Sequence, residues 1–231
     1  MAMTDLLSIG ILPVVLTLCA FLLGQKIQQK FKSPLLNPIL LGVIFVLLFL
    51  GATGYAVTEY KAGMNAISWL LTPATVCLAV PMYEQLQILK KNLPMILVGV
   101  AAGAVSCLIM VLLFAAVAGF DPVLTRSLLP KSITSAIGSV LSEMTGGMPA
   151  ITTAAIIFSG ITANSLGTFL CRLFRLTDPI AQGVAFGTSG HVIGTTKANE
   201  ISPLVGAVSS LSLVVAGLLT AVILPLFSNF I

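Results

Sequence analysis

The segment 187–197 (GTSGHVIGTTK) gathers the side chains of this sequence that are best suited to binding an anion. Its candidate ligands are hydroxyl, imidazole, ammonium and glycine backbone groups, at Thr188, Ser189, His191, Gly194, Thr195 and Lys197. Glycines permit a break in a helix, and a helix that restarts there directs free N–H groups and its positive dipole end to one place. The residue types therefore predict a binding site for a small anion.

Close helix packing is the alternative explanation for the glycines, because small residues let membrane helices approach one another. Packing does not account for His191 and Lys197, since a charged side chain near the bilayer centre costs about 3 kcal/mol on insertion scales. We therefore expect His191 and Lys197 to lie close together inside the protein, and each glycine taken alone to serve packing.

A second candidate site lies in the segment 130–135 (PKSITS). A proline at a helix start, followed by Lys131, Ser132 and Thr134, builds a donor-rich and positively charged helix N-terminus that suits a carboxylate or a phosphate. The alternative is an interfacial Lys131 that extends its ammonium group to the membrane surface. Glu143 and Glu200 are the predicted charge partners of the two lysines, or participants in proton coupling.

Motifs for a nucleotide or a metal are absent from the sequence, which has no GxxxxGK[ST] and no HExxH pattern and contains a single histidine. The four cysteines, Cys19, Cys77, Cys107 and Cys171, are far apart, which favours small core residues over a disulfide or metal framework. No serine is marked as a nucleophile activated by His191. We expect no cofactor, no metal, no nucleic-acid partner and no enzymatic activity.

The composition assigns these segments to a membrane. Of the 231 residues, 58% are hydrophobic and 8% are charged, whereas soluble domains carry roughly 25% charged residues. Spans of about 20 apolar residues are long enough to cross a bilayer as helices, and six are predicted, at 6–24, 39–57, 66–83, 95–118, 149–171 and 203–227. Asp5 rather than a basic region precedes the first span, so we expect a retained helix rather than a signal peptide.

The distribution of basic residues predicts how the two polar stretches, 127–147 and 181–202, meet the membrane. If 127–147 dips into the membrane and returns, nearly all bases outside the polar stretches fall on the inner side: Lys26, Lys30, Lys32, Lys90, Lys91, Arg172 and Arg175. Lys61 and Arg126 then lie outside. By the same logic 181–202 enters from the inside, and both termini are external.

Prolines interrupt the third predicted span, in the segments 72–75 (TPAT) and 81–84 (PMYE). Such prolines free backbone carbonyl groups that need other partners. Two interpretations remain open, a discontinuous helix that lines a substrate path and a kinked helix that serves packing.

The two polar stretches resemble each other. The residues 135–138 (SAIG) with Glu143 correspond to 191–194 (HVIG) with Glu200, and a proline-led apolar helix follows each. Inverted repeats with broken helices are typical of secondary transporters. The predicted fold is therefore an all-α polytopic membrane protein with about six transmembrane helices and two re-entrant or broken segments in an inverted repeat. We expect one integral membrane domain, with N-terminal helices in 1–93 and a transport core in 94–231.

Short motifs spread over nearly the whole chain resemble those of the LrgB/CidB family of bacterial membrane proteins, which includes YohK-like proteins and is related to the plastid glycolate/glycerate carrier. The motifs are NPI at 37–39, PMYE at 81–84, PKSIT at 130–134, GGMP at 146–149, DP at 178–179 and GAVSSL at 206–211, together with Gly187, Thr188, His191, Gly194 and Thr195. This chain departs from the family pattern at Ser135 and Ala136, where Thr-Pro is usual, and at Gly190, where serine is usual.

The resemblance implies two functions and a multi-pass location in the bacterial cell (inner) membrane. One is transport of small monocarboxylates such as glycolate, pyruvate or lactate by a secondary carrier, with proton coupling as an option. The alternative is an antiholin-like regulator of murein hydrolase activity and autolysis that acts with a small LrgA/CidA-type membrane partner. The charged residues at predicted helix breaks favour the carrier, and we expect a homo-oligomer in the lipid bilayer.

Overall fold

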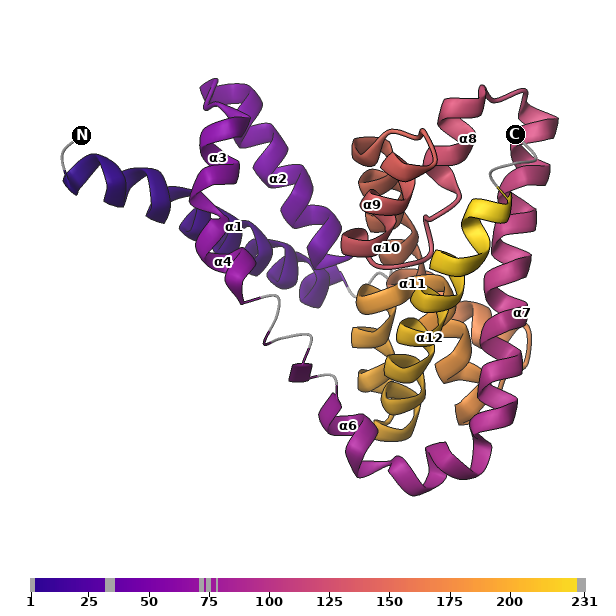
Figure 1. Cartoon of the computed structure of the whole chain (residues 1–231). Coiled ribbons are helices and arrows are strands. Elements are labelled where there is room, and N and C mark those ends of the chain that lie inside the picture. The colour runs from indigo at the N-terminus through magenta and orange to yellow at the C-terminus, as the bar shows by residue number, and fades with distance from the viewer. Residues whose placement is uncertain (1–2, 32–35, 71–72, 74–75, 78, 228–231) are drawn as a thin grey trace. The chain divides into compact units, whose positions relative to one another are not determined.

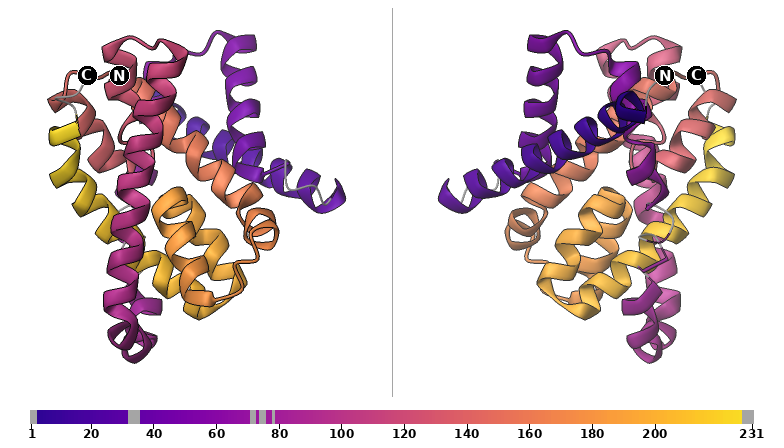
Figure 2. Two further views of the ribbon diagram at one scale, coloured as in Figure 1. Left: turned by 90° about the vertical axis from the view of Figure 1, so that its right-hand side faces the viewer. Right: turned by 90° about the vertical axis from the view of Figure 1, so that its left-hand side faces the viewer.

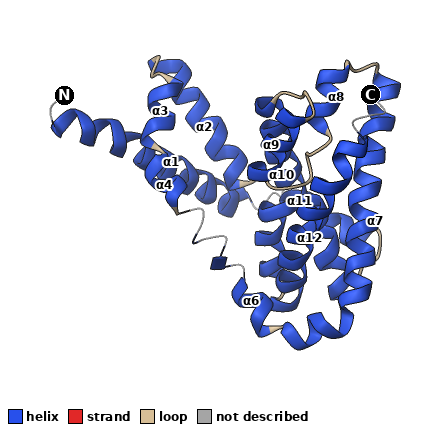
Figure 3. Cartoon of the chain, in the orientation of Figure 1, coloured by secondary structure: helices blue, strands red, loops and turns tan. Residues whose placement is uncertain are grey.

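The computed structural model describes residues 3–31, 36–70, 73, 76–77 and 79–227. Helices are the only regular elements within these ranges, as Figure 3 shows. The chain divides into two compact units, Met1–Cys77 and Leu78–Ile231, each of which is described by itself. The predicted division of one domain at residues 93 and 94 stays a prediction.

The first unit contains α1 (Met3–Phe31), α2 (Pro38–Thr53), α3 (Val57–Gly63) and α4 (Asn65–Trp69). Asn37 caps α2 because its side-chain oxygen accepts a hydrogen bond of 2.8 Å from the Ile39 N–H. α2 ends at Gly54, whose φ of 67° favours glycine. Ala20 of α1 is buried in a core cluster with Val46 and Leu50 of α2.

Four helices of the described part are long and apolar enough to cross a membrane: Ile11–Phe31, Leu86–Ala118, Pro149–Leu173 and Pro203–Phe227. The predicted span at 39–57 is the shorter apolar helix α2. The predicted span at 66–83 is not continuous in the described residues, since α4 ends at Trp69 and α6 begins at Ala79. Thr72 and Thr75 of that span, and Lys32 of the predicted topology, lie outside the described residues. The protein is an all-helical polytopic membrane protein.

The second unit contains α6 (Ala79–Glu84), α7 (Leu86–Ala118), α8 (Pro122–Leu128), α9 (Ser135–Met144), α10 (Pro149–Leu173), α11 (Pro179–Ile201) and α12 (Pro203–Phe227) (Figure 1). A proline is the first residue of each of α8, α10, α11 and α12. The first N–H groups of a helix have no partner within it, so the N–H that proline lacks costs no hydrogen bond. Asp121 and Asp178 cap α8 and α11 by accepting hydrogen bonds from backbone N–H groups.

The first polar stretch forms a hairpin, here called hairpin 1 (122–144), in which α8, a break at 129–134 and α9 fold back on themselves. The hydroxyl of Thr152 in α10 donates to Ser127 O at 2.8 Å and to Ser142 Oγ at 2.7 Å. The end of α8 therefore lies beside the end of α9. A methyl group added at Gly138 would lie 2.6 Å from Ile156 and 3.4 Å from Pro130 O, so α9 also runs antiparallel to α10.

The second polar stretch forms hairpin 2 (179–201), because α11 breaks at His191, where φ is 42° and ψ is −135°. A methyl group added at Gly194 would lie 2.7 Å from Phe186 O. In a straight helix these residues would be about 12 Å apart along the axis, so the two halves of α11 fold back against each other. Thr195 in the second half bonds Ser209 of α12.

The two hairpins approach the middle of α12 from opposite ends. Gly183 and Gly187 of hairpin 2 pack against residues 205–213 of α12. Ile137 of hairpin 1 contacts Gly217, and Leu129 clusters with Leu224. Residues 99–103 of α7 likewise face hairpin 2, whereas Cys107 and Leu108 face hairpin 1. This opposed arrangement fits the predicted inverted repeat, and the two turned views in Figure 2 show the same helices from both sides.

Two pairs of basic residues of the second unit lie at one end of it. Arg172 and Arg175 lie at the base of hairpin 2, where they line one pocket with Gln182 and Ile201. Lys90 and Lys91 precede the part of α7 that packs against hairpin 2, with Gly99 against Val184. Both pairs therefore lie at the same end of the unit. Which side of the membrane this end faces stays a prediction.

Candidate functional site

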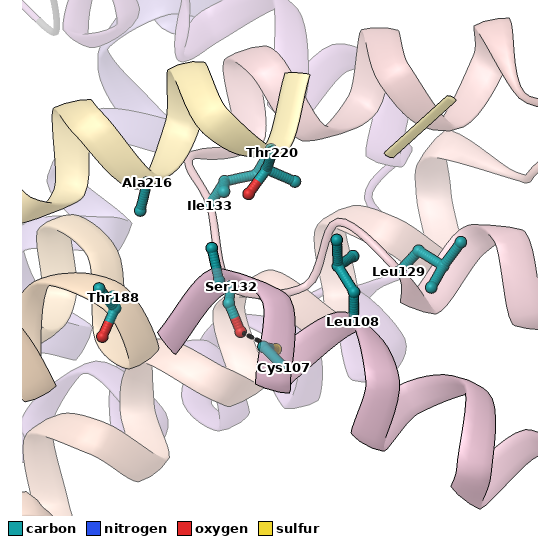
Figure 4. A pocket seen from close by; sticks show the side chains of 9 residues that line it. Cys107, Leu108, Leu129, Ser132, Ile133, Thr188, Ala216 and Thr220 are labelled. Atoms are coloured by element: carbon teal, nitrogen blue, oxygen red, sulfur yellow. Dashed lines mark hydrogen bonds between the residues drawn. The ribbon is translucent and has the colours of Figure 1, made fainter. Parts of the chain in front are cut away.

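The tips of the two hairpins meet at a small pocket between α7 and α12 (Figure 4). Its polar lining comes from four elements of the chain: Cys107 of α7, Ser132 of hairpin 1, Thr188 of hairpin 2 and Thr220 of α12. The remaining lining is aliphatic. The free volume is about 10 Å³, which suffices for about one water molecule. The pocket is therefore closed to anything as large as a carboxylate.

Lys131 and Ser132 form the tip of hairpin 1. Ser132 is buried, and its Oγ lies 2.9 Å from the Cys107 Sγ. The Lys131 ammonium group donates to the same Ser132 Oγ at 3.2 Å. No carboxylate of the described residues lies within ion-pair distance of Lys131. Thr134 precedes α9, and its side chain makes no capping hydrogen bond there.

Glu143 is not the charge partner of Lys131. It lies one residue before the end of α9, near the base of hairpin 1, and it is exposed. The ten-residue helix α9 separates it from the tip. The ammonium group of Lys131 therefore retains hydrogen-bonding capacity and an uncompensated positive charge.

Thr188 and Ser189 lie near the end of the first half of α11, and they differ in solvent exposure. Thr188 is buried, and its hydroxyl donates to Val184 O at 2.7 Å and borders the pocket. Ser189 is exposed, its hydroxyl donates to Ala185 O, and its carbonyl accepts from Ser159. Only Thr188 joins the pocket that hairpin 1 closes.

His191 fastens the tip of hairpin 2 to α10. Its side chain is 4% exposed, and Nε2 lies 2.8 Å from Ile156 O. Because a carbonyl oxygen only accepts, Nε2 carries the hydrogen of this bond. A methyl group added at Gly160 would lie 2.6 Å from the imidazole, so the ring occupies a space that glycine leaves open. The imidazole thus has a structural partner within the protein.

The rest of the predicted segment leads away from the pocket. Thr195 donates to His191 O and bonds Ser209, both at 2.8 Å, and Gly194 serves close packing of the two halves of α11. Lys197 forms a 2.6 Å ion pair with Glu200, with side chains 32% and 64% exposed. Lys197 lies six residues beyond His191, which is about 9 Å along a helix. The prediction that His191 and Lys197 lie together inside the protein is wrong for Lys197, whose neighbour Glu200 neutralises it.

Cys107 and Thr220 are pocket residues that the sequence analysis missed. Each is an isolated polar side chain in an apolar helix, and such residues carry no local signal of a site. The hydroxyl-bearing side chains of the last span, at Ser209, Ser210, Ser212 and Thr220, are a pattern that could have indicated this helix. The Ser210 and Ser212 hydroxyls are buried without a hydrogen-bond partner in the described part of the chain.

The comparisons with known proteins agree along nearly the whole chain. The model of the LrgB-like family matches residues 17–230. "Antiholin-like protein LrgB" of Bacillus cereus (strain B4264) is 34% identical over 219 residues, which cover 94% of this chain and 95% of that protein. The protein of the same name from Bacillus anthracis (strain CDC 684 / NRRL 3495) matches with the same identity and coverage. No solved structure matches. The chain belongs to the LrgB-like family.

Proposed function

We propose that this protein is a secondary carrier for small monocarboxylates of the glycolate, pyruvate and lactate type in the bacterial cell membrane. The observation that supports it is the meeting of two opposed re-entrant hairpins at a buried pocket, beside a lysine that has no carboxylate partner among the described residues. Broken helices that meet near the midplane are how many secondary transporters build their substrate sites.

The closed pocket supports a carrier over a permanent pore. The pocket has room for about one water molecule, which is less than a two- or three-carbon carboxylate needs, so the ligand binds only when the hairpin tips separate. Opening toward one side at a time is the movement that alternating access requires. The uncompensated charge of Lys131 then offers an incoming anion a charge-assisted hydrogen bond.

The test is uptake of radiolabelled pyruvate or glycolate by proteoliposomes that contain the purified protein. Saturable uptake above that of protein-free liposomes is expected, and its dependence on an imposed pH gradient tests proton coupling. The Lys131→Gln variant should lose most of this uptake at low substrate concentration. Uptake that equals the protein-free control at every concentration would remove the carrier proposal.

The second candidate is antiholin-like control of murein hydrolase activity together with a small LrgA/CidA-type membrane partner. The names of the relatives favour this candidate more directly than transport, because both are called antiholin-like. Rates of autolysis in cells that lack the chain, complemented with wild type or Lys131→Gln, separate the two candidates. Complementation by both forms favours a direct antiholin-like role, and complementation by wild type alone links autolysis to transport.

A further inference from the structure

Thr220 is a buried residue whose hydroxyl group borders the pocket. The residue is 5% exposed and lines the pocket. No hydrogen bond of the described residues involves this hydroxyl, whereas most of the described threonines donate to a carbonyl one turn earlier, as Thr188 does. Figure 4 shows the Thr220 oxygen turned from α12 toward the space between the hairpin tips. Because this hydroxyl borders the pocket and has no partner among the described residues, it is available to bond a ligand there.

A lysine beside the pocket supplies the positive charge. Lys131 reaches the Ser132 hydroxyl from outside the pocket and holds it against Cys107. An ammonium group has three donors, and only one has a partner in the residues that the structure describes. Ser132 and Thr220 therefore line the pocket from two different elements, and Lys131 adds donors beside Ser132.

We infer that the carboxylate of the substrate binds between Lys131, Ser132 and Thr220, at a wall formed by Cys107. This inference rests on the proposed carrier function, and it assigns the ligand to the hairpin 1 side of the pocket. We place His191 and Lys197 outside this site, because His191 bonds Ile156 O and Lys197 pairs with Glu200. The contact of Ser132 with Cys107 closes the site and breaks when the ligand enters.

The experiment is protection of Cys107 from N-ethylmaleimide in a protein whose other cysteines are serine. Pyruvate or glycolate at about ten times its Kd leaves about one-eleventh of the sites free, so we expect modification to slow about tenfold. A protein that retains only Cys19, which is exposed in the first unit, is the control and should show no protection.

Variants identify the ligands. Lys131→Gln should abolish protection at the same concentration, and Thr220→Val should weaken it several-fold without unfolding the protein, since the hydroxyl has no partner to lose in the described residues. In the Lys197→Gln variant, pyruvate or glycolate should protect Cys107 as strongly as in the parent protein. Loss of protection in Lys197→Gln but not in Lys131→Gln would overturn the assignment, and so would a Cys107 that resists the reagent both in detergent and in liposomes.

The outcome also separates this site from the carrier function. Saturable uptake without protection of Cys107 would disprove the site and leave transport standing. Protection that depends on Lys131 without uptake would support the site and disprove the carrier. Neither uptake nor protection, with Cys107 readily modified, would disprove both.

Discussion

His191 combines an unfavourable backbone with a buried hydrogen bond. Its φ of 42° and ψ of −135° lie in a region that glycine occupies readily and other residues do not. The imidazole bond to Ile156 O offsets this strain. The side chain and the backbone therefore have opposite effects on stability, and substitutions can separate them.

We expect His191→Ala to destabilise the protein by about 1–3 kcal/mol, because the buried bond from the imidazole to Ile156 O is lost while the strain remains. His191→Gly loses the same bond but relieves strain of about 1–3 kcal/mol. The glycine variant should therefore melt at a higher temperature than the alanine variant in detergent. An alanine variant as stable as the glycine variant would show that the backbone at this position is not strained.

Lys197→Gln tests the corrected assignment of the second lysine. The Lys197 and Glu200 side chains are paired near the base of hairpin 2 and partly exposed, and exposed ion pairs contribute little to stability. We expect the KM for pyruvate uptake to stay within about twofold of wild type. Loss of a substrate contact that contributes about 1.4 kcal/mol to binding would raise it about tenfold. A tenfold or larger rise in KM would return Lys197 to the substrate site.

At the scale of the elements, glycines hold each hairpin closed. Gly194→Ala would place its methyl group 2.7 Å from Phe186 O and force the halves of α11 apart, so we expect a loss of about 1–3 kcal/mol. Gly51→Ala is the matched control, since it lies within α2 with nothing within 4 Å of the added methyl group. That change should be neutral or stabilising by up to about 1 kcal/mol. Thermal unfolding measures both, and equal effects would contradict the close packing of the halves.

The sequence predicted these hairpins better than it predicted their ligands. Glycine, proline and hydroxyl side chains in 127–147 and 181–202 are unsuited to lipid contact, and this is a local property. The pairing of Lys197 with Glu200 also follows from their i,i+3 spacing on a helix. The separation of Lys197 from His191 depends on the residue at which the second half of α11 begins, which the spacing does not give. Cys107, Ser132 and Thr220 line one pocket only because distant parts of the chain pack together. Residue spacing along the sequence does not predict such packing.

At the scale of the second unit, the two hairpins predict a sidedness. Cysteines placed at Lys91 and Arg175 should react with an impermeant thiol reagent from the same side of the membrane. Lys91 lies in α7 before the residues that pack on hairpin 2, and Arg175 lines a pocket at the base of that hairpin. A cysteine at the exposed Met144, near the base of hairpin 1, should react from the opposite side. Labelling of positions 91 and 175 from opposite sides would mean that hairpin 1 crosses the membrane.

The movement of hairpin 1 is the central claim, and the contact between Ser132 and Cys107 allows it to be blocked. Ser132→Cys, with Cys107 as the other remaining cysteine, puts two sulfur atoms where the Oγ and Sγ now lie 2.9 Å apart, and oxidation should join them. The measurement is pyruvate uptake by proteoliposomes before and after reduction of this disulfide. We predict no saturable uptake in the oxidised protein and recovery on reduction. Equal and saturable uptake in both states, with the disulfide verified by mass spectrometry, would contradict the account.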